Sequence, residues 1–311
     1  MERLLITGID YPLGSNLALR LSEQCEVLGV SSHFLVESPY LRSEAWRPGD
    51  WGAIKELIQG WHPHWIVHCG PLSDSSWEVL GNVESLAHEP QVVAHLARLA
   101  AEQSARLTVL SSDTVFTGPR MFHGESSPAF SSSARALQVR AMERALESTD
   151  ALVVRTHAYG WSSVAATASF AQQVHEMLSS GGSIQASGLH YATPILATDL
   201  ADLLWRAYEL GLRGLYHLAG AERTSSFRFV SELASAFGLH FPLEVRKPRE
   251  TTARTEHDET SLDSKRARRV LEMSTPMLRE GLHCFVEQTQ NGWRDGWCVT
   301  GPIFGQTEIA A

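Results

Sequence analysis

This sequence alternates short apolar runs with longer segments whose apolar residues recur at helical spacing, and no other feature narrows the choice of fold as far. The short runs predict buried strands that begin at Leu4, Glu26, Trp65, Leu107, Leu152 and Leu215. The longer segments predict helices over 15–21, 51–59, 90–103, 134–146, 170–178 and 226–237, and over a stretch that Thr198 or Asp199 caps and Leu210 ends. Strands and helices in alternation form a parallel sheet with helices on both faces, so we expect a doubly wound α/β fold.

Two regions lack this regularity. Residues 34–49 have no usable period and contain two prolines, and beyond Phe237 the only clear element is a short helix over 265–271. Residues 288–311 form a tail with Trp293, Trp297 and Phe304 among glycines. We expect this tail either to fold back on its own domain or to act as an arm that packs on a partner or sister subunit.

The composition excludes several classes of function. A formal net charge of -9 does not provide the basic surface that nucleic-acid binding needs. No apolar run approaches the roughly 18 residues of a membrane helix, and the N-terminus enters a strand at once, without a signal peptide. The four cysteines have no paired spacing, and His62, His64, His68 and Cys69 match no standard zinc pattern. We expect a cytoplasmic protein that binds no nucleic acid, membrane or metal.

The first predicted strand runs directly into a glycine turn and a helix, as in a dinucleotide-binding unit. Gly8 and Gly14 take the outer glycine positions of that motif, but Tyr11 replaces the middle one, where the backbone approaches the phosphates. Pro12 suits the first helical position. After the second strand, Ser31 and Ser32 stand where an NAD site usually has an acidic residue, which favours NADP if a dinucleotide binds; an ordinary polar loop is the alternative.

Residues 107–118, with the sequence LTVLSSDTVFTG, join a predicted buried strand to a polar turn. Ser111, Ser112, Asp113 and Thr114 follow the apolar part directly. Ligands of open parallel sheets bind beyond the carboxyl ends of the strands, so these side chains are candidate site residues. A turn whose side chains satisfy its own backbone is the alternative interpretation.

Further short motifs are spread from Leu4 to about Phe285. They are Leu5-Ile6-Thr7-Gly8 with Leu13-Gly14, Ile66-Val67-His68-Cys69, Ser112-Asp113-Thr114-Val115-Phe116 with Gly118, Glu125 with Pro128, Arg155-Thr156 with Tyr159-Gly160, Tyr191-Ala192-Thr193-Pro194 with Asp199-Leu200-Ala201, Gly214-Leu215-Tyr216-His217-Leu218 with Gly220, and Ser261-Leu262-Asp263. In this order the chain resembles the extended short-chain dehydrogenase/reductases, and most closely the dTDP-4-dehydrorhamnose reductase-like branch, which binds sugar nucleotides.

The resemblance implies a Rossmann-type doubly wound parallel sheet with a smaller C-terminal substrate-binding lobe. It divides the chain into a dinucleotide-binding domain over 1–157 plus 195–218 and a lobe over 158–194 plus 219–287, with residues 288–311 as a tail or arm. The lobe would close over the carboxyl edge of the sheet, where a sugar nucleotide would lie.

The resemblance also implies the residues of the site. NADP or NAD would be the cofactor, held by Gly8, Tyr11, Leu13, Gly14, Ser31, Ser32, Asp50, Trp51, Cys69, Gly70, Pro71 and His157. The substrate would contact Asp113, Thr114, Phe116, Tyr159 and Tyr191. In the family, the hydroxyl at the position of Ser112 orients the substrate carbonyl, and Ser112 is the one catalytic position retained here.

The family's catalytic pair is missing from this chain. In the family a tyrosine gives its proton to the developing alkoxide, and a lysine four residues later lowers the tyrosine pKa. Glu143 matches the glutamate that follows this lysine, which puts Val139 at the lysine position and Arg135 at the tyrosine position. No tyrosine or lysine occurs between Ser111 and Asp150. We expect Arg135 to be a solvated helix position and Val139 a packed one.

Three hypotheses follow from this loss. In the first, a degenerate, non-reducing relative binds NAD(P) or a sugar nucleotide as a regulatory or scaffolding subunit, alone, as a homodimer or with a protein partner; the beta subunit of methionine adenosyltransferase shows such a use of this branch. In the second, an active NADPH-dependent reductase of a 4-keto sugar nucleotide uses a replacement acid, with His157, Tyr159 and His123 as candidates. In the third, the pocket serves other chemistry or binds an unrelated small molecule.

Overall fold

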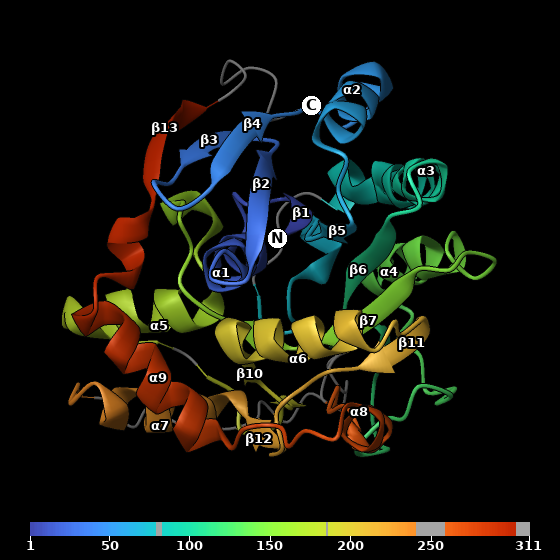
Figure 1. Ribbon diagram of the computed structural model, residues 1–311. Helices are drawn as coiled ribbons and strands as arrows, with labels where there is room; N and C mark the ends of the chain where they lie inside the picture. Colours follow the sequence, from blue (N-terminus) through green and yellow to red (C-terminus); the bar gives the residue numbers. More distant parts are fainter. Residues whose placement is uncertain (79–82, 185, 241–258, 303–311) are drawn as a thin grey trace.

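A seven-stranded parallel sheet lies at the centre of the computed structural model, which describes residues 1–78, 83–184, 186–240 and 259–302 (Figure 1). The strand order is β11-β7-β6-β5-β1-β2-β4, and every neighbouring pair is parallel. These strands are β1 (Glu2–Thr7), β2 (Cys25–Ser31), β4 (Arg42–Ala45), β5 (Trp65–His68), β6 (Arg106–Ser112), β7 (Leu152–Thr156) and β11 (Gly214–His217). The expected parallel α/β sheet is confirmed.

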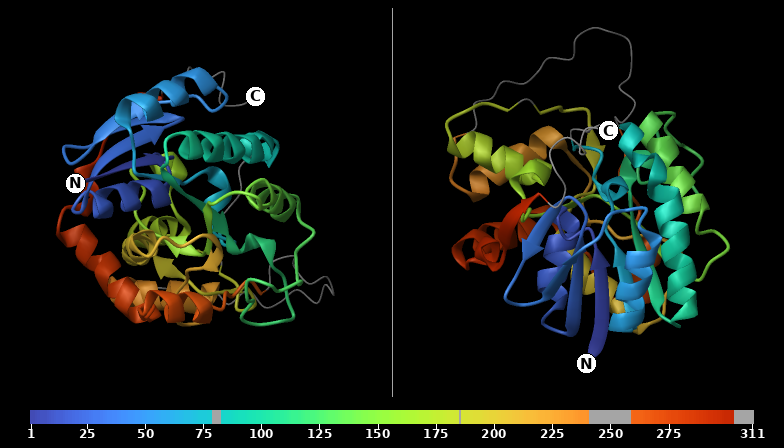
Figure 2. Two further views of the ribbon diagram at one scale, coloured as in Figure 1. Left: turned by 45° about the vertical axis from the view of Figure 1, so that its right-hand side comes forward. Right: turned by 90° about the horizontal axis from the view of Figure 1, so that it is seen from above.

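Helices cover both faces of this sheet. One face carries α1 (Pro12–Leu21) and α6 (Ala197–Glu209), and the other carries α2 (Trp51–Trp61), α3 (Glu89–Glu102) and α4 (Ala134–Arg144) (Figures 1 and 2). Successive residues of a strand point to opposite faces. Leu4 and Ile6 therefore pack in the core under α1 and α6, whereas Leu5 packs in the core under α2, α3 and α4.

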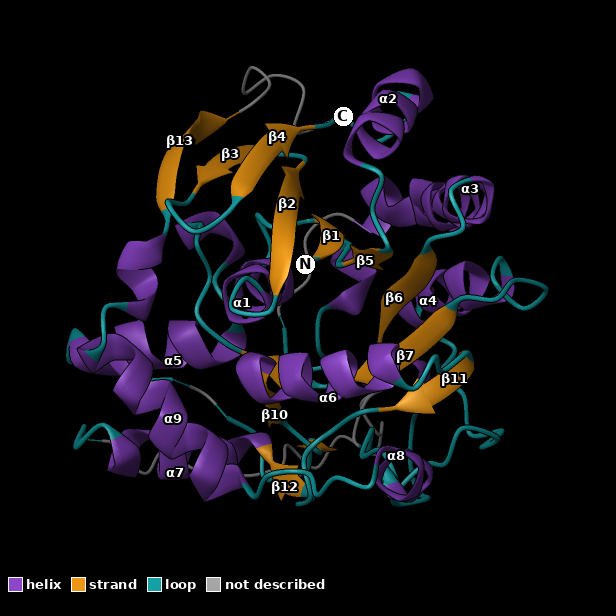
Figure 3. Cartoon of the chain, in the orientation of Figure 1, coloured by secondary structure: helices purple, strands orange, loops and turns teal. Residues whose placement is uncertain are grey.

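A smaller lobe packs against the loops at one end of the sheet. It contains α5 (Phe170–Ser179), α7 (Ser226–Ala236) and α9 (Leu278–Gln290) (Figure 3). These helices contribute to a third, aromatic-rich core. Two short strand pairs lie beside these helices. They are β8 (Ala158–Tyr159) with β10 (Ile195–Leu196), and β9 (Tyr191–Ala192) with β12 (Thr224–Ser225). The helix α8 (Lys265–Leu271) packs beside β11 and α6, at the position predicted from the sequence.

Segments of the lobe bond to the residues that follow the sheet strands. The hydroxyl of Thr167 donates to the carbonyl oxygen of Asp10 over 2.7 Å, just after β1, and that of Thr260 donates to the carboxylate of Asp113, just after β6. The lobe therefore lies over the carboxyl edge of the sheet, which is where open parallel sheets bind their ligands.

The structure corrects the predictions for residues 34–49, for the region beyond Phe237 and for the cap of α6. Beyond Phe237 the 13-residue helix α9 follows α8, so the expectation that α8 is the only clear element there was wrong. Residues 34–49 contain β3 (Phe34–Glu37) as well as β4, so the expectation of irregular structure there was wrong. Strands this short leave little periodic signal, and their partners come from β2 and from the distant β13 (Cys298–Pro302). The N-cap of α6 is Leu196, without a side-chain hydrogen bond, rather than Thr198 or Asp199.

The tail folds back on its own chain as far as it is described. After α9 a 3₁₀ turn (Trp293–Gly296) leads into β13, which pairs antiparallel with β3. The indole Nε1 of Trp293 donates to Oδ1 of Asn16 on α1 over 3.0 Å. The remaining tail positions 303–311, which include Phe304, lie outside the described residues.

Two further properties concern the described chain as a whole. No described helix combines the length and the apolar character needed to cross a bilayer. Cys25, Cys69, Cys284 and Cys298 are all free thiols.

Candidate functional site

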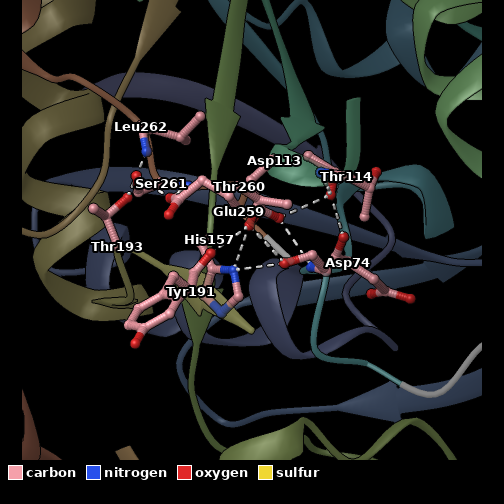
Figure 4. Close-up of polar contacts among 12 residues, drawn as sticks. Asp74, Asp113, Thr114, His157, Tyr191, Thr193, Glu259, Thr260, Ser261 and Leu262 are labelled. Carbon is pink, nitrogen blue, oxygen red and sulfur yellow. Dashed lines mark hydrogen bonds and ion pairs between the residues drawn. The ribbon is translucent and has the colours of Figure 1, made fainter. Parts of the chain in front are cut away.

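Polar side chains gather where β5, β6 and β7 end at the carboxyl edge (Figure 4). The loop after β5 contributes Asp74 and Ser76, the turn after β6 contributes Asp113, and His157 follows β7. The lobe contributes Thr260. The residues that follow neighbouring parallel strands lie at the same edge of the sheet. Side chains that are far apart in the sequence therefore meet here.

Asp113 and His157 form a buried ion pair at the centre of this cluster. The Nδ1 of His157 lies 2.7 Å from Oδ2 of Asp113, and the two side chains are 2% and 0% exposed. Ser76 donates to the same carboxylate through its backbone N–H, over 2.9 Å, and its hydroxyl, over 2.8 Å. Burial acts to raise the pKa of Asp113, but the charge of His157 and the hydrogen bonds from His157, Thr260 and Ser76 hold it below its usual value. Asp113 is therefore ionised, and Nδ1 of His157 must donate to it.

Ser112 directs its hydroxyl into the protein. Its Oγ donates to the carbonyl oxygen of Asp74 over 2.6 Å and accepts from the backbone N–H of Thr114 over 3.2 Å. A serine hydroxyl has a single proton, so in this arrangement it has none to offer to a substrate carbonyl.

Arg135 is buried, and the expectation that it is solvated was wrong. Its side chain is 2% exposed, and its Nη2 donates to the carbonyl oxygen of Asp74 over 2.7 Å and lies 3.9 Å from the Asp74 carboxylate. Arg135 faces the site because it lies at the start of α4, next to the loop after β5. Val139, one turn later, is fully buried among the core residues under α4, as expected.

Two carboxylates beside Arg135 hold their protons unusually tightly. Burial raises the pKa of Asp74 to about 6, and the charge of Arg135 partly offsets this. Burial, followed by the charge of Asp74, raises the pKa of Glu78 to about 8, although its Oε1 accepts from the backbone N–H of Phe170 over 2.9 Å. The charge of Arg135 therefore offsets only part of the effect of burial on the pKa of these two carboxyl groups.

The other expected substrate contacts are dispersed. Thr114 is 1% exposed, next to Ser112. Phe116 is fully buried and stacks on His123 at a centroid distance of 4.3 Å. Tyr159 is 4% exposed and packs edge-on against Phe229 in the lobe core.

Tyr191 lies at the margin of the lobe. Its ring is partly exposed, and the guanidinium of Arg223 covers one face at 3.5 Å from the centroid. Its carbonyl oxygen accepts from the backbone N–H of Thr260 over 2.9 Å, which links it to the cluster around Asp113. The structure therefore brings Ser112, Asp113 and His157 together, with Thr114 and Tyr191 nearby, and puts Phe116 and Tyr159 into hydrophobic cores.

Sequence reasoning missed Asp74, Ser76, Trp77 and Thr260. The indole of Trp77 packs edge-on against the ring of His157 at a centroid distance of 4.4 Å and also contacts Phe229 of the lobe. The loop after a central parallel strand is a regular place for site residues, so the 71–78 segment carried a usable signal. Thr260 directly precedes the Ser261-Leu262-Asp263 motif but carries no signal of its own.

Gly8 and Gly14 shape a tight turn between β1 and α1. Gly8 has a φ of +81°, and a Cβ on it would lie 2.0 Å from the carbonyl oxygen of Cys69. A Cβ on Gly14 would lie 2.0 Å from the carbonyl oxygen of Gly8. Both positions therefore require glycine, as the outer positions of a dinucleotide-binding turn do.

Tyr11 fills the space above this turn. Its Cδ2 would lie 3.4 Å from a Cβ on Gly8, and its hydroxyl oxygen lies 3.5 Å from Nδ1 of His33, beyond the end of β2. Burial, and then the neighbouring carboxylates with Asp10 first, raise the pKa of Tyr11 well above its usual value. The phenol is therefore neutral, and its ring spans the carboxyl edge from β1 to β2.

The remaining cofactor candidates lie at the ends of β2 and β5 and at the start of α2. Ser31 is fully buried, and Asp50 caps α2 by accepting from the backbone N–H of Ala53 over 3.0 Å. A Cβ on Gly70 would lie 2.3 Å from a carboxylate oxygen of Glu89. The others are Leu13 and Cys69, which are buried, Ser32 after β2, Trp51 at the start of α2, and Pro71 at the start of a 3₁₀ turn.

The histidines near this edge are engaged with protein groups. Nδ1 of His68 lies 2.7 Å from the hydroxyl of Thr7, and its Nε2 lies 3.0 Å from the carboxylate of Glu89. Both nitrogens of His123 also have partners, the hydroxyl of Ser127 and the carbonyl oxygen of Glu259. Among the described residues, no His, Cys, Asp and Glu side chains are grouped to hold a metal ion.

Comparison with known proteins now decides the family. The profile described as RmlD substrate binding domain matches residues 1–291. This chain belongs to that family. The beta subunit of methionine adenosyltransferase 2 from Xenopus laevis is 27% identical over 249 residues, or 76% of this chain and 73% of that protein. dTDP-4-dehydrorhamnose reductase from Mycobacterium tuberculosis is 27% identical over 239 residues, or 73% of this chain and 72% of that protein.

Several solved structures share the fold of this chain. A hypothetical dTDP-4-dehydrorhamnose reductase from Sulfolobus tokodaii superposes with a TM-score of 0.70 at 24% identity, covering 88% of this chain and 95% of that one. The dTDP-4-dehydrorhamnose reductase of Bacillus anthracis, solved with NADP, has a TM-score of 0.73 at 19% identity, covering 93% and 100%. The Bordetella bronchiseptica enzyme WbmH, also similar in structure, was solved with NAD+. The resemblance that the motifs suggested is confirmed.

The glycine turn between β1 and α1 has only some of the features that bind the pyrophosphate of a dinucleotide. Its outer glycines fit, but the ring of Tyr11 stands where the pyrophosphate would approach the backbone. Pro12 has no N–H to offer to a phosphate, so the first turn of α1 offers only the amides of Leu13 and Gly14, which have no backbone acceptor among the described residues. The pyrophosphate of NAD(P) therefore does not fit this turn with Tyr11 in its present position.

Proposed function

We propose that this protein is a non-reducing member of the family, which binds a sugar nucleotide or a related nucleotide at the carboxyl edge and acts as a regulatory or scaffolding subunit. The observation that carries the proposal is the place of Arg135. At the position of the family's proton-donating tyrosine, a guanidinium is buried and bonded to the carbonyl oxygen of Asp74. A guanidinium keeps its proton at any physiological pH, so Arg135 cannot replace a tyrosine as an acid.

Two neighbouring positions support the same conclusion. Val139 packs in the core, so the position that the resemblance assigns to the lysine offers no ammonium group to lower the pKa of an acid or to hold a ribose. Ser112, the retained catalytic position, directs its proton to Asp74. Three groups of the reductase chemistry are thus missing from this edge of the sheet or engaged with protein groups.

The regulatory part of the proposal rests on similarity. One of the similar curated proteins is named as the beta subunit of an adenosyltransferase, and so as a component of an assembly. A subunit of that kind needs a folded domain and a binding surface but no hydride transfer, which agrees with the arrangement around Arg135.

A binding assay and a turnover assay on the same preparation test the proposal. Titration calorimetry with dTDP- and UDP-sugars is expected to show saturable binding. A spectrophotometric assay with NADPH and a 4-keto-6-deoxy sugar nucleotide is expected to show no oxidation of NADPH above the background of a heat-denatured sample. Turnover would refute the non-reducing assignment, and the absence of binding to every nucleotide sugar tested would refute the ligand.

The Asp113–His157 pair favours a second candidate, a reductase of a 4-keto sugar nucleotide with His157 as the replacement acid. Its Nδ1 is fixed by Asp113, as in sites where a carboxylate orients a catalytic imidazole. The other two candidate acids are less suited, because His123 has both nitrogens engaged and Tyr159 is buried in the lobe with a raised pKa. If NADPH turnover occurs, it should be lost in His157→Gln and retained in Tyr159→Phe. Turnover that survives His157→Gln would exclude this candidate.

A further inference from the structure

The carboxylate of Asp10 occupies an anion-binding position made by the protein's own backbone. Asp10 is fully buried in the turn after β1. Its Oδ2 accepts from three consecutive backbone N–H groups, those of Ser32 over 3.2 Å, His33 over 2.8 Å and Phe34 over 3.4 Å. Successive amides that converge on one point form a concave site for an anion.

These amides directly follow β2. In dinucleotide-binding folds the end of this strand lies beside the adenosine ribose, and it receives either the 2′-hydroxyl of NAD or the 2′-phosphate of NADP. The sequence shows no acidic residue at this strand end. The structure brings a carboxylate there from the glycine turn instead, and the second oxygen of Asp10, Oδ1, is buried with no partner among the described residues.

Tyr11, the next residue, occupies the second anion position, where the pyrophosphate of a dinucleotide would approach the glycine turn. Asp10 and Tyr11 both contact His33. The Tyr11 ring lies edge-on to the imidazole at a centroid distance of 5.9 Å, and Nδ1 of His33 lies 3.5 Å from Oδ2 of Asp10. The lobe fixes the same turn, because Ser163 donates to the carbonyl oxygen of Ile9 over 3.3 Å.

We propose that Asp10 and Tyr11 are internal occupants of the two anion positions of the dinucleotide cleft, so that either dinucleotide binds only by displacing the Tyr11 ring, and NADP is disfavoured more strongly than NAD because Asp10 opposes its 2′-phosphate. The pyrophosphate of either dinucleotide competes with the Tyr11 ring. The 2′-phosphate of NADP also meets the buried charge of Asp10 and finds the amides of residues 32–34 already engaged. Two like charges a few ångströms apart repel strongly where water is excluded. This proposal goes beyond the proposed function, because it concerns the dinucleotide cleft and not the sugar-nucleotide end of the site.

Dissociation constants for NADH and NADPH, measured by calorimetry at pH 8, test the proposal. The full chain would be compared as wild type, Tyr11→Gly, Asp10→Asn and the double variant. Tyr11→Gly is expected to bind NADH at least about tenfold more tightly than the wild type, with NADPH remaining weaker. Adding Asp10→Asn is expected to raise the affinity for NADPH by at least about tenfold and to change that for NADH much less. Asparagine keeps an oxygen for the three amides, so the loop after β2 should retain its shape.

Matched variants separate these effects from general ones. Tyr11→Phe keeps the ring and should bind both dinucleotides as weakly as the wild type. Glu26→Gln removes one negative charge from an exposed position of β2 and should leave the NADH to NADPH ratio unchanged. Far-ultraviolet circular dichroism checks that each variant is folded.

Three outcomes would overturn the proposal. They are tight binding of NADPH by the wild type, equal affinities of the wild type and Tyr11→Gly for NADH, and an unchanged NADPH affinity when Asp10→Asn is added. None of them bears on whether dTDP- or UDP-sugars bind, so failure here is distinguishable from failure of the proposed function.

Discussion

Arg135 and Ser112 donate hydrogen bonds to the same acceptor, the carbonyl oxygen of Asp74, over 2.7 and 2.6 Å. Arg135, which the resemblance assigns to the position of the family's tyrosine, and Ser112 are thus both directed at one loop of the chain itself. A carbonyl oxygen has two lone pairs, so this acceptor is saturated and fixes the loop after β5 against β6 and α4. These two contacts engage the side chains of Arg135 and Ser112 and hold the site together.

Removing the buried guanidinium should destabilise the fold. Arg135→Met leaves the Asp74 carbonyl with one donor and leaves nearby carboxylates without a buried cation. We expect a loss of about 2–3 kcal/mol in the free energy of unfolding, the range for hydrogen bonds to charged groups. Urea denaturation measures it. Arg144→Met, at an exposed position of the same helix, should change stability by less than about 0.5 kcal/mol. Equal losses in both variants would contradict the assigned role of Arg135.

The raised pKa of Glu78 should appear in the pH dependence of stability. Its pKa rises from 4.5 to about 8 on folding, so between these values the folded state holds a proton that the unfolded state has lost. The contribution of Glu78 to stability is therefore present at low pH and falls as pH rises through this window. We expect Glu78→Gln to gain stability relative to the wild type between pH 5 and 8, measured by urea denaturation at several pH values. A difference that stays constant with pH would show that the pKa of Glu78 is not raised.

The Asp113–His157 pair should act as a coupled unit in a double-mutant cycle. Asp113→Asn leaves His157 without its buried counter-charge, and His157→Gln leaves Asp113 without a charged donor. Each single substitution should cost about 2–4 kcal/mol, because breaking a buried ion pair leaves one group unpaired. The double variant should lose less than the sum, with a coupling energy of about 1–3 kcal/mol from chemical denaturation. Strict additivity would mean that the 2.7 Å contact contributes nothing of its own.

Gly14 and Gly60 should differ in how well they tolerate replacement by alanine. A Cβ on Gly14 would meet the backbone of Gly8, which cannot move aside, so Gly14→Ala should be strongly destabilising, by about 3 kcal/mol or more. Gly60→Ala adds the same atom inside α2, where no atom lies within 4 Å, and should be neutral or stabilising by up to about 1 kcal/mol. Thermal or urea unfolding compares the two. If Gly14→Ala were tolerated as well as Gly60→Ala, the turn could not be as tight as described.

Local patterns allowed much of the fold to be predicted. The strands beginning near Leu4, Trp65, Leu107 and Leu152 and most helix boundaries follow from apolar periodicity and from caps such as Asp50 and Ser133, whose signals lie within a few neighbouring residues. The short strands β3 and β13 were missed because their hydrogen-bond partners are far away in the sequence. The cap of α6 was misassigned because Thr198 and Asp199 fall inside its first turn.

The sequence by itself determined that Ser112, Asp113 and His157 follow predicted strands, that no tyrosine or lysine occurs between Ser111 and Asp150, and that Tyr11 stands in the glycine turn. Only the tertiary structure decided what these residues contact. It buried Arg135 against the loop of Asp74, paired Asp113 with His157, and brought Asp10 to the end of β2. The physical reason is that side-chain bonding depends on which strand ends become neighbours in the sheet, and residues separated by tens of positions along the chain carry no local signal of that arrangement.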